Sequence, residues 1–279
     1  MTEEVEVKVA KKAIEDAEAV LITAGAGMGV DSGLPDFRGN EGFWNAYPIA
    51  KKLGLRFYEL ANPLWFEKDP SLAWAFYGHR LKLYRETNPH EGFYLLKKLT
   101  EKKNDNYFVI TSNVDGQFQK AGFNESKIVE IHGSIHHLQC TKPCSDEIWS
   151  SESVEIKIDM ENFKALPPFP KCINCKSIAR PNILMFNDPF WIPDRTEGQK
   201  FRLDIWLEKV ENKGQNIVII EIGAGKAIPT IRYLSESITR KLNGFLIRIN
   251  PRDYDMPTST NGVSLKTGGL EGLKMILDL

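Results

Sequence analysis

A short apolar run that ends in closely spaced glycines is the feature of this sequence that most constrains its fold. Residues 18–23 are typical of a buried strand, and Gly25, Gly27, Gly29 and Gly33 follow them. Glycine permits a positive φ angle and a close approach of the backbone to a ligand. A glycine turn between a strand and a helix start presents N–H groups to an anion, usually a phosphate. A tight turn also needs glycine, so the loop is a candidate phosphate site that requires support from elsewhere.

Other apolar runs alternate with helical patterns along the chain. Strands are expected at residues 107–111, 127–131, 216–222, 244–250 and 262–265, and helices at 8–18, 54–85, 89–99 and 201–210. This alternation predicts an α/β fold with a Rossmann-like parallel sheet and helices on both faces. Residues 181–186 are expected to return to this sheet. Ligands of such sheets bind at the carboxyl ends of the strands, so the glycine loop, Asn113, His132, Gly223 and Asn250 are expected on one rim.

Composition excludes several classes of protein. The chain has 279 residues, 42% hydrophobic and 26% charged, as in ordinary soluble globular proteins. Its formal net charge of -1 gives no general attraction to nucleic acid or to a membrane surface. The acidic N-terminal sequence lacks the order of a signal peptide, and no apolar stretch approaches a membrane span. We therefore expect a cytoplasmic protein without nucleic-acid or membrane partners, and the sequence carries no signal for an oligomeric state.

The four cysteines fall into two tight pairs. Cys140 and Cys144 form the first pair, and Cys172 and Cys175 form the second. Four thiolates in two close pairs are what a tetrahedral structural zinc requires, and a dispersed disulfide framework would look different. The surrounding stretch has few long apolar runs, so metal-linked folding would explain how it holds together. Four buried or redox-active thiols are the alternative.

Polar residues at two strand ends are candidates for chemistry. Asn113 and Asp115 follow the expected strand 107–111 and have the groups to hydrogen-bond a ribose or an amide, although turns favour the same residue types. His132 follows the strand 127–131, where a histidine that titrates near neutrality can act as a general base. A partly buried histidine with satisfied hydrogen bonds is the alternative.

Several of these motifs, taken in order, resemble the sirtuin family over nearly the whole chain. The residues 25–27, 32–33 and 36–39 are similar to its first NAD-binding signature. The segments Thr111-Ser-Asn-Val-Asp115 and Ile131-His-Gly-Ser134, and then the cysteine pairs, follow as they do in sirtuins. The motifs are specific jointly and much less so singly.

The resemblance implies an NAD-dependent enzyme that removes acyl groups from protein lysine and releases nicotinamide and O-acyl-ADP-ribose. It implies that NAD and one structural zinc are bound, and that an acylated protein is the partner. In this comparison His132 is the catalytic base, Asn113 contacts the ribose, Asp115 contacts the nicotinamide carboxamide, and Phe37 and Arg38 shield the reacting centre. The expected NAD-binding residues are Ala24, Gly25, Ala26, Gly27, Asp36, Phe37, Arg38, Ser112, Asn113, Asp115, Gly223, Ala224, Gly225, Asn250, Pro251, Lys266 and Thr267.

The resemblance also divides the chain. A Rossmann-like NAD domain is expected from residues 1–40, 86–137 and 181–279. A small helical module is expected at 41–85, where Asp69 and Pro70 are a good helix start, and a small zinc module at 138–180.

Tyr77 and Arg80 lie three residues apart on an expected helix and so share a face. A phenol and a guanidinium on one face can hold a carboxylate, and Tyr-x-x-Arg resembles sirtuins that remove succinyl and malonyl groups. A packed tyrosine beside a surface arginine paired with Glu86 is the alternative. Ile183 and Phe186 are expected to contact the substrate, because residues 181–188 stand where sirtuins pair with the substrate backbone as an extra strand.

The chain departs from the family pattern at several positions. Ser112 stands in place of the usual glutamine, and Ala224 and Gly225 in place of threonine and serine. Asn187, Asp188 and Pro189 follow the phenylalanine, and a proline offers no N–H to strand pairing. These departures keep two alternatives open: protein ADP-ribosyl transfer or NAD hydrolysis, and an NAD-sensing module without turnover. The intact His132 argues against the second.

Overall fold

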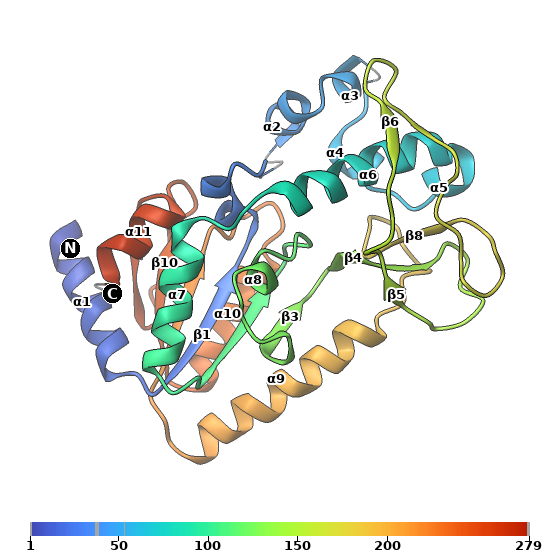
Figure 1. Cartoon of the computed structure of the whole chain (residues 1–279). Helices are drawn as coiled ribbons and strands as arrows, with labels where there is room; N and C mark the ends of the chain where they lie inside the picture. Colours follow the sequence, from blue (N-terminus) through green and yellow to red (C-terminus); the bar gives the residue numbers. More distant parts are fainter. Residues whose placement is uncertain (1, 37–38, 53, 278–279) are drawn as a thin grey trace.

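A six-stranded parallel sheet forms the centre of the molecule (Figure 1). The computed structural model describes residues 2–36, 39–52 and 54–277. The strands lie in the order β11-β10-β9-β1-β2-β3. Their bounds are β1 Ala19–Ala24, β2 Tyr107–Thr111, β3 Ile128–Glu130, β9 Ile217–Ile222, β10 Phe245–Ile249 and β11 Gly262–Leu265. All five pairings are parallel, as the sequence predicted.

The strand order places a topological switch point beside β1. The chain runs outward from β1 to β2 and β3, and then resumes on the other side of β1 with β9, β10 and β11. This is the arrangement of dinucleotide-binding sheets, in which the ligand crosses the crevice where the strand order reverses. The short apolar runs form these strands because both of their faces are covered.

Helices cover both faces of the sheet. Successive residues of β1 point to opposite sides. Val20 and Ile22 join one apolar core with the helices α1 (Glu3–Asp16), α7 (Glu91–Lys102) and α11 (Gly269–Ile276). Leu21 joins the other with α9 (Asp194–Asn212) and α10 (Thr230–Lys241). The predicted α/β class is confirmed.

A second, aromatic-rich core lies beside the sheet. It contains the helices α2 (Gly39–Ala46), α3 (Pro48–Lys52), α4 (Phe57–Leu60), α5 (Trp65–Lys68) and α6 (Pro70–Glu86). The helix α6 begins where the sequence predicted. The Asp69 carboxylate accepts a hydrogen bond from the Leu72 N–H at 3.0 Å, and Pro70 occupies the first turn.

The cysteine-bearing segment forms small antiparallel sheets. The strands β4 (Gly133–Cys140), β5 (Trp149–Ser150) and β8 (Ala179–Ile183) make one, and β6 (Lys157–Asp159) and β7 (Lys164–Leu166) make the other. The expected return of residues 181–186 to the main sheet is wrong, because β8 pairs with β4. The segment also has more core than expected. Phe163 and Ala165 are buried in the same apolar core as the α6 residues Trp74 and Phe76.

The remaining elements are short. They are the 3₁₀ helices η1 (Ala26–Ser32) and η2 (Glu125–Lys127) and the helix α8 (Gln117–Lys120). Among the described residues, no helix has the length and apolar character needed to cross a bilayer.

Candidate functional site

The carboxyl ends of the strands bring the candidate residues to one edge of the main sheet. Asn113 follows β2, His132 follows β3, Gly223 follows β9 and Asn250 follows β10. Because all six strands are parallel, these ends lie on the same rim. The glycine loop after β1 lies at the switch point between the two halves of this rim.

The two glycine loops pack directly against each other. The Gly25 N–H donates to the Ile222 carbonyl at 2.9 Å, and the Gly27 N–H donates to the Gly223 carbonyl at 3.1 Å. Gly223 has a φ of +64°, and a Cβ on it would lie 2.4 Å from the Gly27 carbonyl carbon. Only glycine fits there. The glycine pattern therefore serves the contact between the two loops at the switch point.

Asn113 ties the loop after β2 to the first glycine loop. Its N–H donates to the Thr111 hydroxyl at 3.0 Å, and its Nδ2 donates to the Gly25 carbonyl at 3.0 Å. The side chain is half-buried. Ser112 lies next to it, and its N–H donates to the Ala24 carbonyl at 3.1 Å. The predicted residues Ala24, Gly25, Ser112 and Asn113 are therefore in direct contact.

Asp115 is a buried carboxyl group in the same loop. Its Oδ1 accepts a hydrogen bond from the Gln117 N–H at 2.9 Å. Burial raises the pKa of Asp115 to about 6; the negative charge of Glu130 adds to the rise, and the positive charge of Arg80 opposes it. A carboxyl group with this pKa changes its charge near neutral pH.

His132 stands at the turn from β3 into β4. Burial lowers the pKa of His132 below its usual 6.5, and a hydrogen bond with the Ser112 backbone opposes this. The imidazole is therefore neutral at pH 7 and able to accept a proton. The next residue, Gly133, has a φ of +77°, and a Cβ on it would lie 2.0 Å from the Asn182 carbonyl oxygen. The glycine of the His-Gly pair is thus required by the close approach of β8.

The segment after β8 lies against His132 and the helical module. Ile183 is buried at the end of β8. The Leu184 N–H donates to the His132 carbonyl at 2.9 Å, and the Phe186 N–H donates to the Ala61 carbonyl at 3.0 Å. Phe186 remains partly exposed, at 38%. Ile183 therefore lies beside the His132–Gly133 turn, and Phe186 lies against the helical module, with its ring centre 6.1 Å from that of Phe57.

A buried ion pair fixes this segment. Arg180 donates to both carboxylate oxygens of Asp188, at 2.7 and 2.8 Å, and both side chains are fully buried. Asp188 also accepts from the Met185 N–H at 3.1 Å. Asn187 between them has a φ of +54°. The residues that depart from the family pattern here form a compact turn with its own charge balance.

Tyr77 and Arg80 are both buried on α6. Arg80 donates to the Tyr84 hydroxyl through Nε and Nη2, at 3.1 and 2.9 Å. Its guanidinium carbon lies 5.2 Å from the centre of the Phe76 ring and 5.7 Å from that of Tyr77. The alternative of a surface arginine does not hold, because only 6% of Arg80 is exposed.

The four cysteines meet at one point. Their sulfur atoms all lie within 4.8 Å of one another. Cys140 Sγ lies 3.6 Å from Cys175 Sγ, and Cys144 Sγ lies 3.6 Å from Cys172 Sγ. Four thiolates at about 2.3 Å from one zinc would be about 3.8 Å apart, so the donor set and its spacing fit a structural zinc.

Asn250 connects the loops after β9 and β10. Its Nδ2 donates to the Ala224 carbonyl at 2.8 Å, and its Oδ1 accepts from the Arg252 N–H at 3.0 Å. Arg252 Nη2 in turn donates to Asp36 at 2.9 Å, on the far side of the first glycine loop. Phe37 and Arg38 lie outside the described residues.

Lys266 and Thr267 follow β11 at the end of the rim. Lys266 Nζ lies 5.0 Å from the centre of the Tyr254 ring. The Thr267 hydroxyl donates to Glu271 at 3.0 Å. Both residues therefore have partners within the protein.

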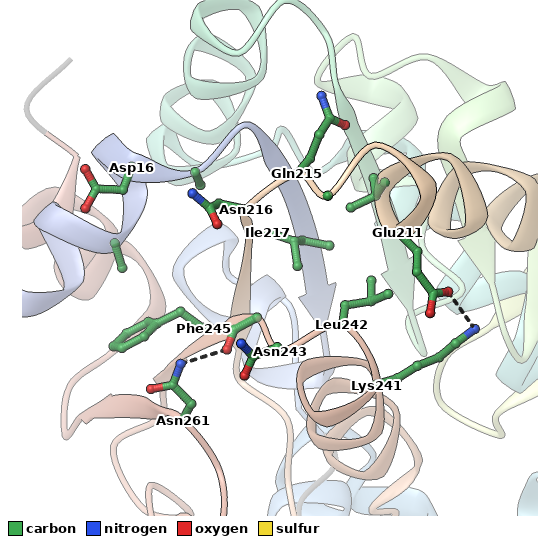
Figure 2. Close-up of a pocket in the computed structure, with 15 residues that line it drawn as sticks. Asp16, Glu211, Gln215, Asn216, Ile217, Lys241, Leu242, Asn243, Phe245 and Asn261 are labelled. Atoms are coloured by element: carbon green, nitrogen blue, oxygen red, sulfur yellow. Dashed lines mark hydrogen bonds and ion pairs between the residues drawn. The ribbon is translucent and has the colours of Figure 1, made fainter.

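One surface hollow lies away from this rim. Figure 2 shows its lining at the opposite, amino-terminal edge of the sheet, around Asn216, Ile217 and Phe245. Its volume is about 550 Å³, and the Lys241–Glu211 ion pair (3.7 Å) borders it. Ligands of parallel sheets bind at the other edge, so this hollow is not the candidate site.

Comparison with models of protein families gives a match for this chain. The Sir2 family model matches residues 25–199, more than half of the sequence. The chain belongs to the Sir2 family. The predicted resemblance to sirtuins is confirmed, although the comparisons do not address the Tyr-x-x-Arg pair.

Curated relatives match this sirtuin over most of their length. The protein of Leptospira interrogans (serovar Lai) is 31% identical over 258 residues, which cover 91% of this chain and 92% of that protein. The protein of Thermococcus sibiricus is 32% identical over 244 residues, which cover 88% and 85%. Each is named an NAD-dependent protein deacylase.

Solved structures of sirtuins share the fold. A Sir2 homologue in complex with NAD is 28% identical, with a TM-score of 0.72, and the match covers 96% of this chain and 92% of that one. A mutant Sir2 homologue in complex with 2′-O-acetyl ADP-ribose is also 28% identical, with a TM-score of 0.67 over 100% and 99% of the two chains.

Sequence reasoning missed the buried charges that shape the rim. Glu221 in β9 and Arg248 in β10 are buried and paired at 2.6 Å. The signal was present, since a charged residue inside an otherwise apolar strand must find a partner. Arg180 beside Asp188 is a second pair that was not foreseen.

Proposed function

We propose that this sirtuin uses NAD to remove acyl groups from protein lysine, with nicotinamide and O-acyl-ADP-ribose as products. Family membership and the names of the relatives confirm the predicted class of enzyme, an NAD-dependent protein deacylase. The observation that carries the assignment is the rim itself. It joins a glycine loop at a dinucleotide switch point to Asn113 and to a neutral histidine.

The residues present fit NAD. The switch point of the sheet lies between the two glycine loops, where Ala26 is exposed and Gly27 and Gly225 are half-buried, so that part of the main chain can be reached by a ligand. We propose that Ala24, Gly25, Ala26, Gly27 and Asp36 border the phosphates and ribose. Ser112, Asn113 and Asp115 would hold the nicotinamide side. The part of NAD remote from nicotinamide would contact Gly223, Ala224, Gly225, Asn250, Pro251, Lys266 and Thr267. Phe37 and Arg38 complete the proposed set.

In the proposed reaction, the substrates supply the reacting groups, and the side chains of the protein orient them and accept a proton. Bound NAD would supply an activated ribose carbon with nicotinamide as its leaving group, and the acyl-lysine would supply the attacking oxygen. Asn113 would orient the ribose; its side chain is fixed by the hydrogen bond from Nδ2 to the Gly25 carbonyl. His132, neutral at pH 7, removes a proton from a ribose hydroxyl. The segment with Ile183 and Phe186 lies beside His132 and would contact the acyl-lysine.

The zinc would hold the outer module and take no part in the reaction. Cys140, Cys144, Cys172 and Cys175 occupy all four tetrahedral positions, which leaves none for a substrate. The proposed division of the chain remains that of the sequence: an NAD domain from 1–40, 86–137 and 181–279, a helical module at 41–85 and a zinc module at 138–180.

For the acyl group, we propose a preference for acidic chains such as succinyl. Arg80 and Tyr77 are buried together on α6, and the positive charge of Arg80 acts on Asp115 in the candidate site. A buried guanidinium favours a carboxylate that reaches it. The influence of Arg80 on Asp115, on the proposed nicotinamide side, supports a role of this arginine in acyl selection.

One observation keeps ADP-ribosyl transfer as a second candidate function. The N–H groups of Leu184, Met185 and Phe186 all donate within the protein, to His132, Asp188 and Ala61. These three groups are therefore not available to pair with a substrate strand. A protein substrate that binds without strand pairing, or water as the acceptor of the ADP-ribosyl group, would be compatible with this segment.

For the cell, we propose a cytoplasmic enzyme that acts on acylated proteins and has no nucleic-acid or membrane partner. Support comes from the paired thiols, which suit a reducing compartment, and from the near-neutral net charge of the chain.

Product analysis by mass spectrometry tests the proposed function. Purified protein is incubated with NAD and one peptide carrying acetyl-lysine, succinyl-lysine or free lysine. O-acyl-ADP-ribose with free lysine supports deacylation. ADP-ribosylated peptide or protein, or free ADP-ribose alone, would replace it with transfer or hydrolysis. Intact NAD in all three reactions would contradict every enzymatic assignment and favour the NAD-sensing module.

A further inference from the structure

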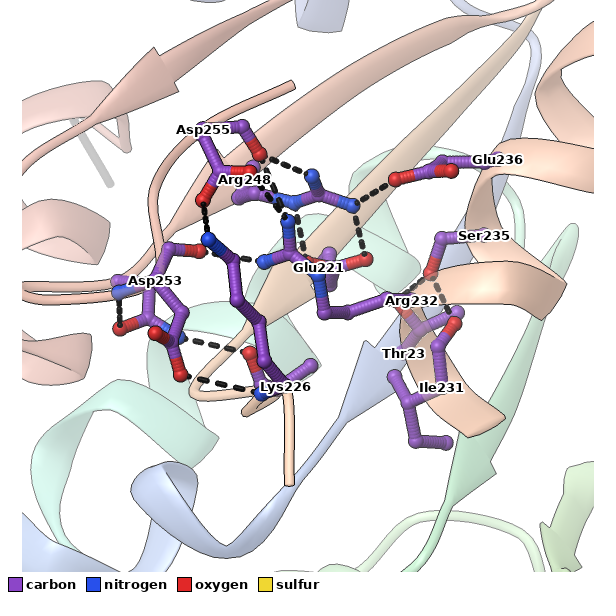
Figure 3. Close-up of polar contacts among 12 residues, drawn as sticks. Thr23, Glu221, Lys226, Ile231, Arg232, Ser235, Glu236, Arg248, Asp253 and Asp255 are labelled. Carbon is purple, nitrogen blue, oxygen red and sulfur yellow. Dashed lines mark hydrogen bonds and ion pairs between the residues drawn. The ribbon is translucent and has the colours of Figure 1, made fainter. Parts of the chain in front are cut away.

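Two charged side chains face each other inside the main sheet. Arg248 of β10 lies opposite Glu221 of β9 in the strand register. Its Nε and Nη2 donate to the two Glu221 oxygens at 2.6 and 3.1 Å, and Nη2 also donates to Glu236 of α10 at 2.8 Å (Figure 3). Arg248 and Glu221 are at most 1% exposed. Burial of such charges is offset only when their geometry is good and their remaining polar atoms are hydrogen-bonded.

The same arginine holds the loop that follows β10. Arg248 Nη1 donates to the Asp255 carbonyl at 2.5 Å. A second buried guanidinium, Arg232 of α10, donates to the Asp253 carbonyl and, at 2.7 Å, to the Asp255 carbonyl. The two arginines thus donate hydrogen bonds to the main-chain carbonyls of Asp253 and Asp255. Residues 250–261 form neither helix nor strand, so these side chains supply contacts that regular structure would otherwise provide.

Lys226 links this loop to the one after β9. Its N–H donates to the Asp253 carboxylate at 3.1 Å, and its Nζ pairs with the Asp255 carboxylate at 2.7 Å. Asn250 makes a second link through the Ala224 carbonyl. Figure 3 shows Lys226, Arg232 and Arg248 converging on Asp253 and Asp255. The two loops therefore form one unit.

The unit borders the candidate site on the side away from the chemistry. β9 and β10 lie across β1 from β2 and β3, the strands that precede Asn113 and His132. Arg252, within the loop, reaches Asp36 beyond the first glycine loop. The loop thus lines the half of the rim where the part of NAD remote from nicotinamide would lie.

We propose that Arg232 and Arg248 are positioning residues for NAD. They hold the loops after β9 and β10 in the bound shape, so that binding does not have to order them. A preformed site binds more tightly because the conformational entropy is lost on folding and not on association. This inference rests on the proposed use of NAD. It adds that affinity for the dinucleotide depends on a buried network that does not touch the reacting atoms.

Arg232 is the better residue to test, because removing Arg248 would leave two buried carboxylates unmatched. We expect Arg232→Met to raise the Kd of NAD and of ADP-ribose about tenfold, or about 1.4 kcal/mol, in calorimetric titrations. At saturating NAD, kcat should stay within about twofold of the wild type, and inhibition by nicotinamide should not change. Arg240→Met, an exposed position on the same helix, is the matched control.

Three results would overturn the inference: an unchanged Kd in Arg232→Met, a loss of kcat without a change in Kd, or an equal effect in Arg240→Met. Should Arg232→Met fail to fold, Arg232→Lys decides. Lysine keeps the charge but cannot grip two carbonyls as the guanidinium fork does, so the Kd should rise about threefold. A wild-type Kd in Arg232→Lys would then refute the idea. Wild-type protein that binds no NAD would instead refute the proposed function.

Discussion

The buried carboxylate of Asp115 should lower the free energy of unfolding at neutral pH, and replacing it with a neutral side chain should raise that free energy again. Its carboxyl pKa is raised from 3.8 to about 6 by burial. At about 1.4 kcal/mol per pKa unit, the charged form is disfavoured by about 3 kcal/mol relative to the unfolded chain. Between these two values the folded state binds more protons than the unfolded state, so the free energy of unfolding falls as pH rises. The penalty is complete above about pH 6 and absent below 3.8.

Asp115→Asn removes the charge and keeps an oxygen for the Gln117 N–H. We expect the variant to be more stable than the wild type at pH 8 by up to about 3 kcal/mol, which is about 6–12 °C in Tm for a chain of this size. The advantage should shrink to nothing by pH 4. Thermal melts across this range, followed by circular dichroism, measure it. Asp204→Asn, at an exposed position of α9, is the control. A Tm difference that is absent at pH 8, or equal at pH 4 and 8, would refute the reasoning.

Three further predictions concern catalysis, zinc and acyl choice. His132→Ala should lower kcat about a hundredfold or more and leave NAD binding intact, and the midpoint of the rise of wild-type kcat with pH should lie below 6.5. Wild-type turnover in the variant would contradict the role of His132. Metal analysis should find about one zinc per chain, and Cys172→Ser should abolish it and lower the Tm; a zinc content near zero with four titratable thiols would count against the site. Succinyl-lysine should be preferred over acetyl-lysine about ten- to a hundredfold in kcat/KM. Arg80→Met should lose the succinyl activity and spare the acetyl activity; equal losses, or a wild-type preference for acetyl, would return Arg80 to a packing role.

Local patterns predicted the elements whose formation depends on neighbouring residues. The buried runs at 107–111 and 262–265 are strands with those bounds, and Asp69 with Pro70 starts α6. These succeed because apolar periodicity and helix capping are properties of short segments. Residues 181–186 failed, because an apolar run does not say which sheet receives it. Here the positive φ of Gly133 turns the chain into β4, which pairs with β8.

The sequence by itself predicted the α/β class, the residues of the rim and the pairing of the four cysteines into one cluster, because each depends on residue type and spacing. Only the tertiary structure decided what those residues experience. The raised pKa of Asp115 and the lowered pKa of His132 both follow from burial of the two side chains. The hydrogen bonds from Arg232 and Arg248 to the Asp255 carbonyl join side chains and a loop that are separated in sequence. Desolvation and long-range pairing depend on which segments meet in space, and no local pattern carries that information.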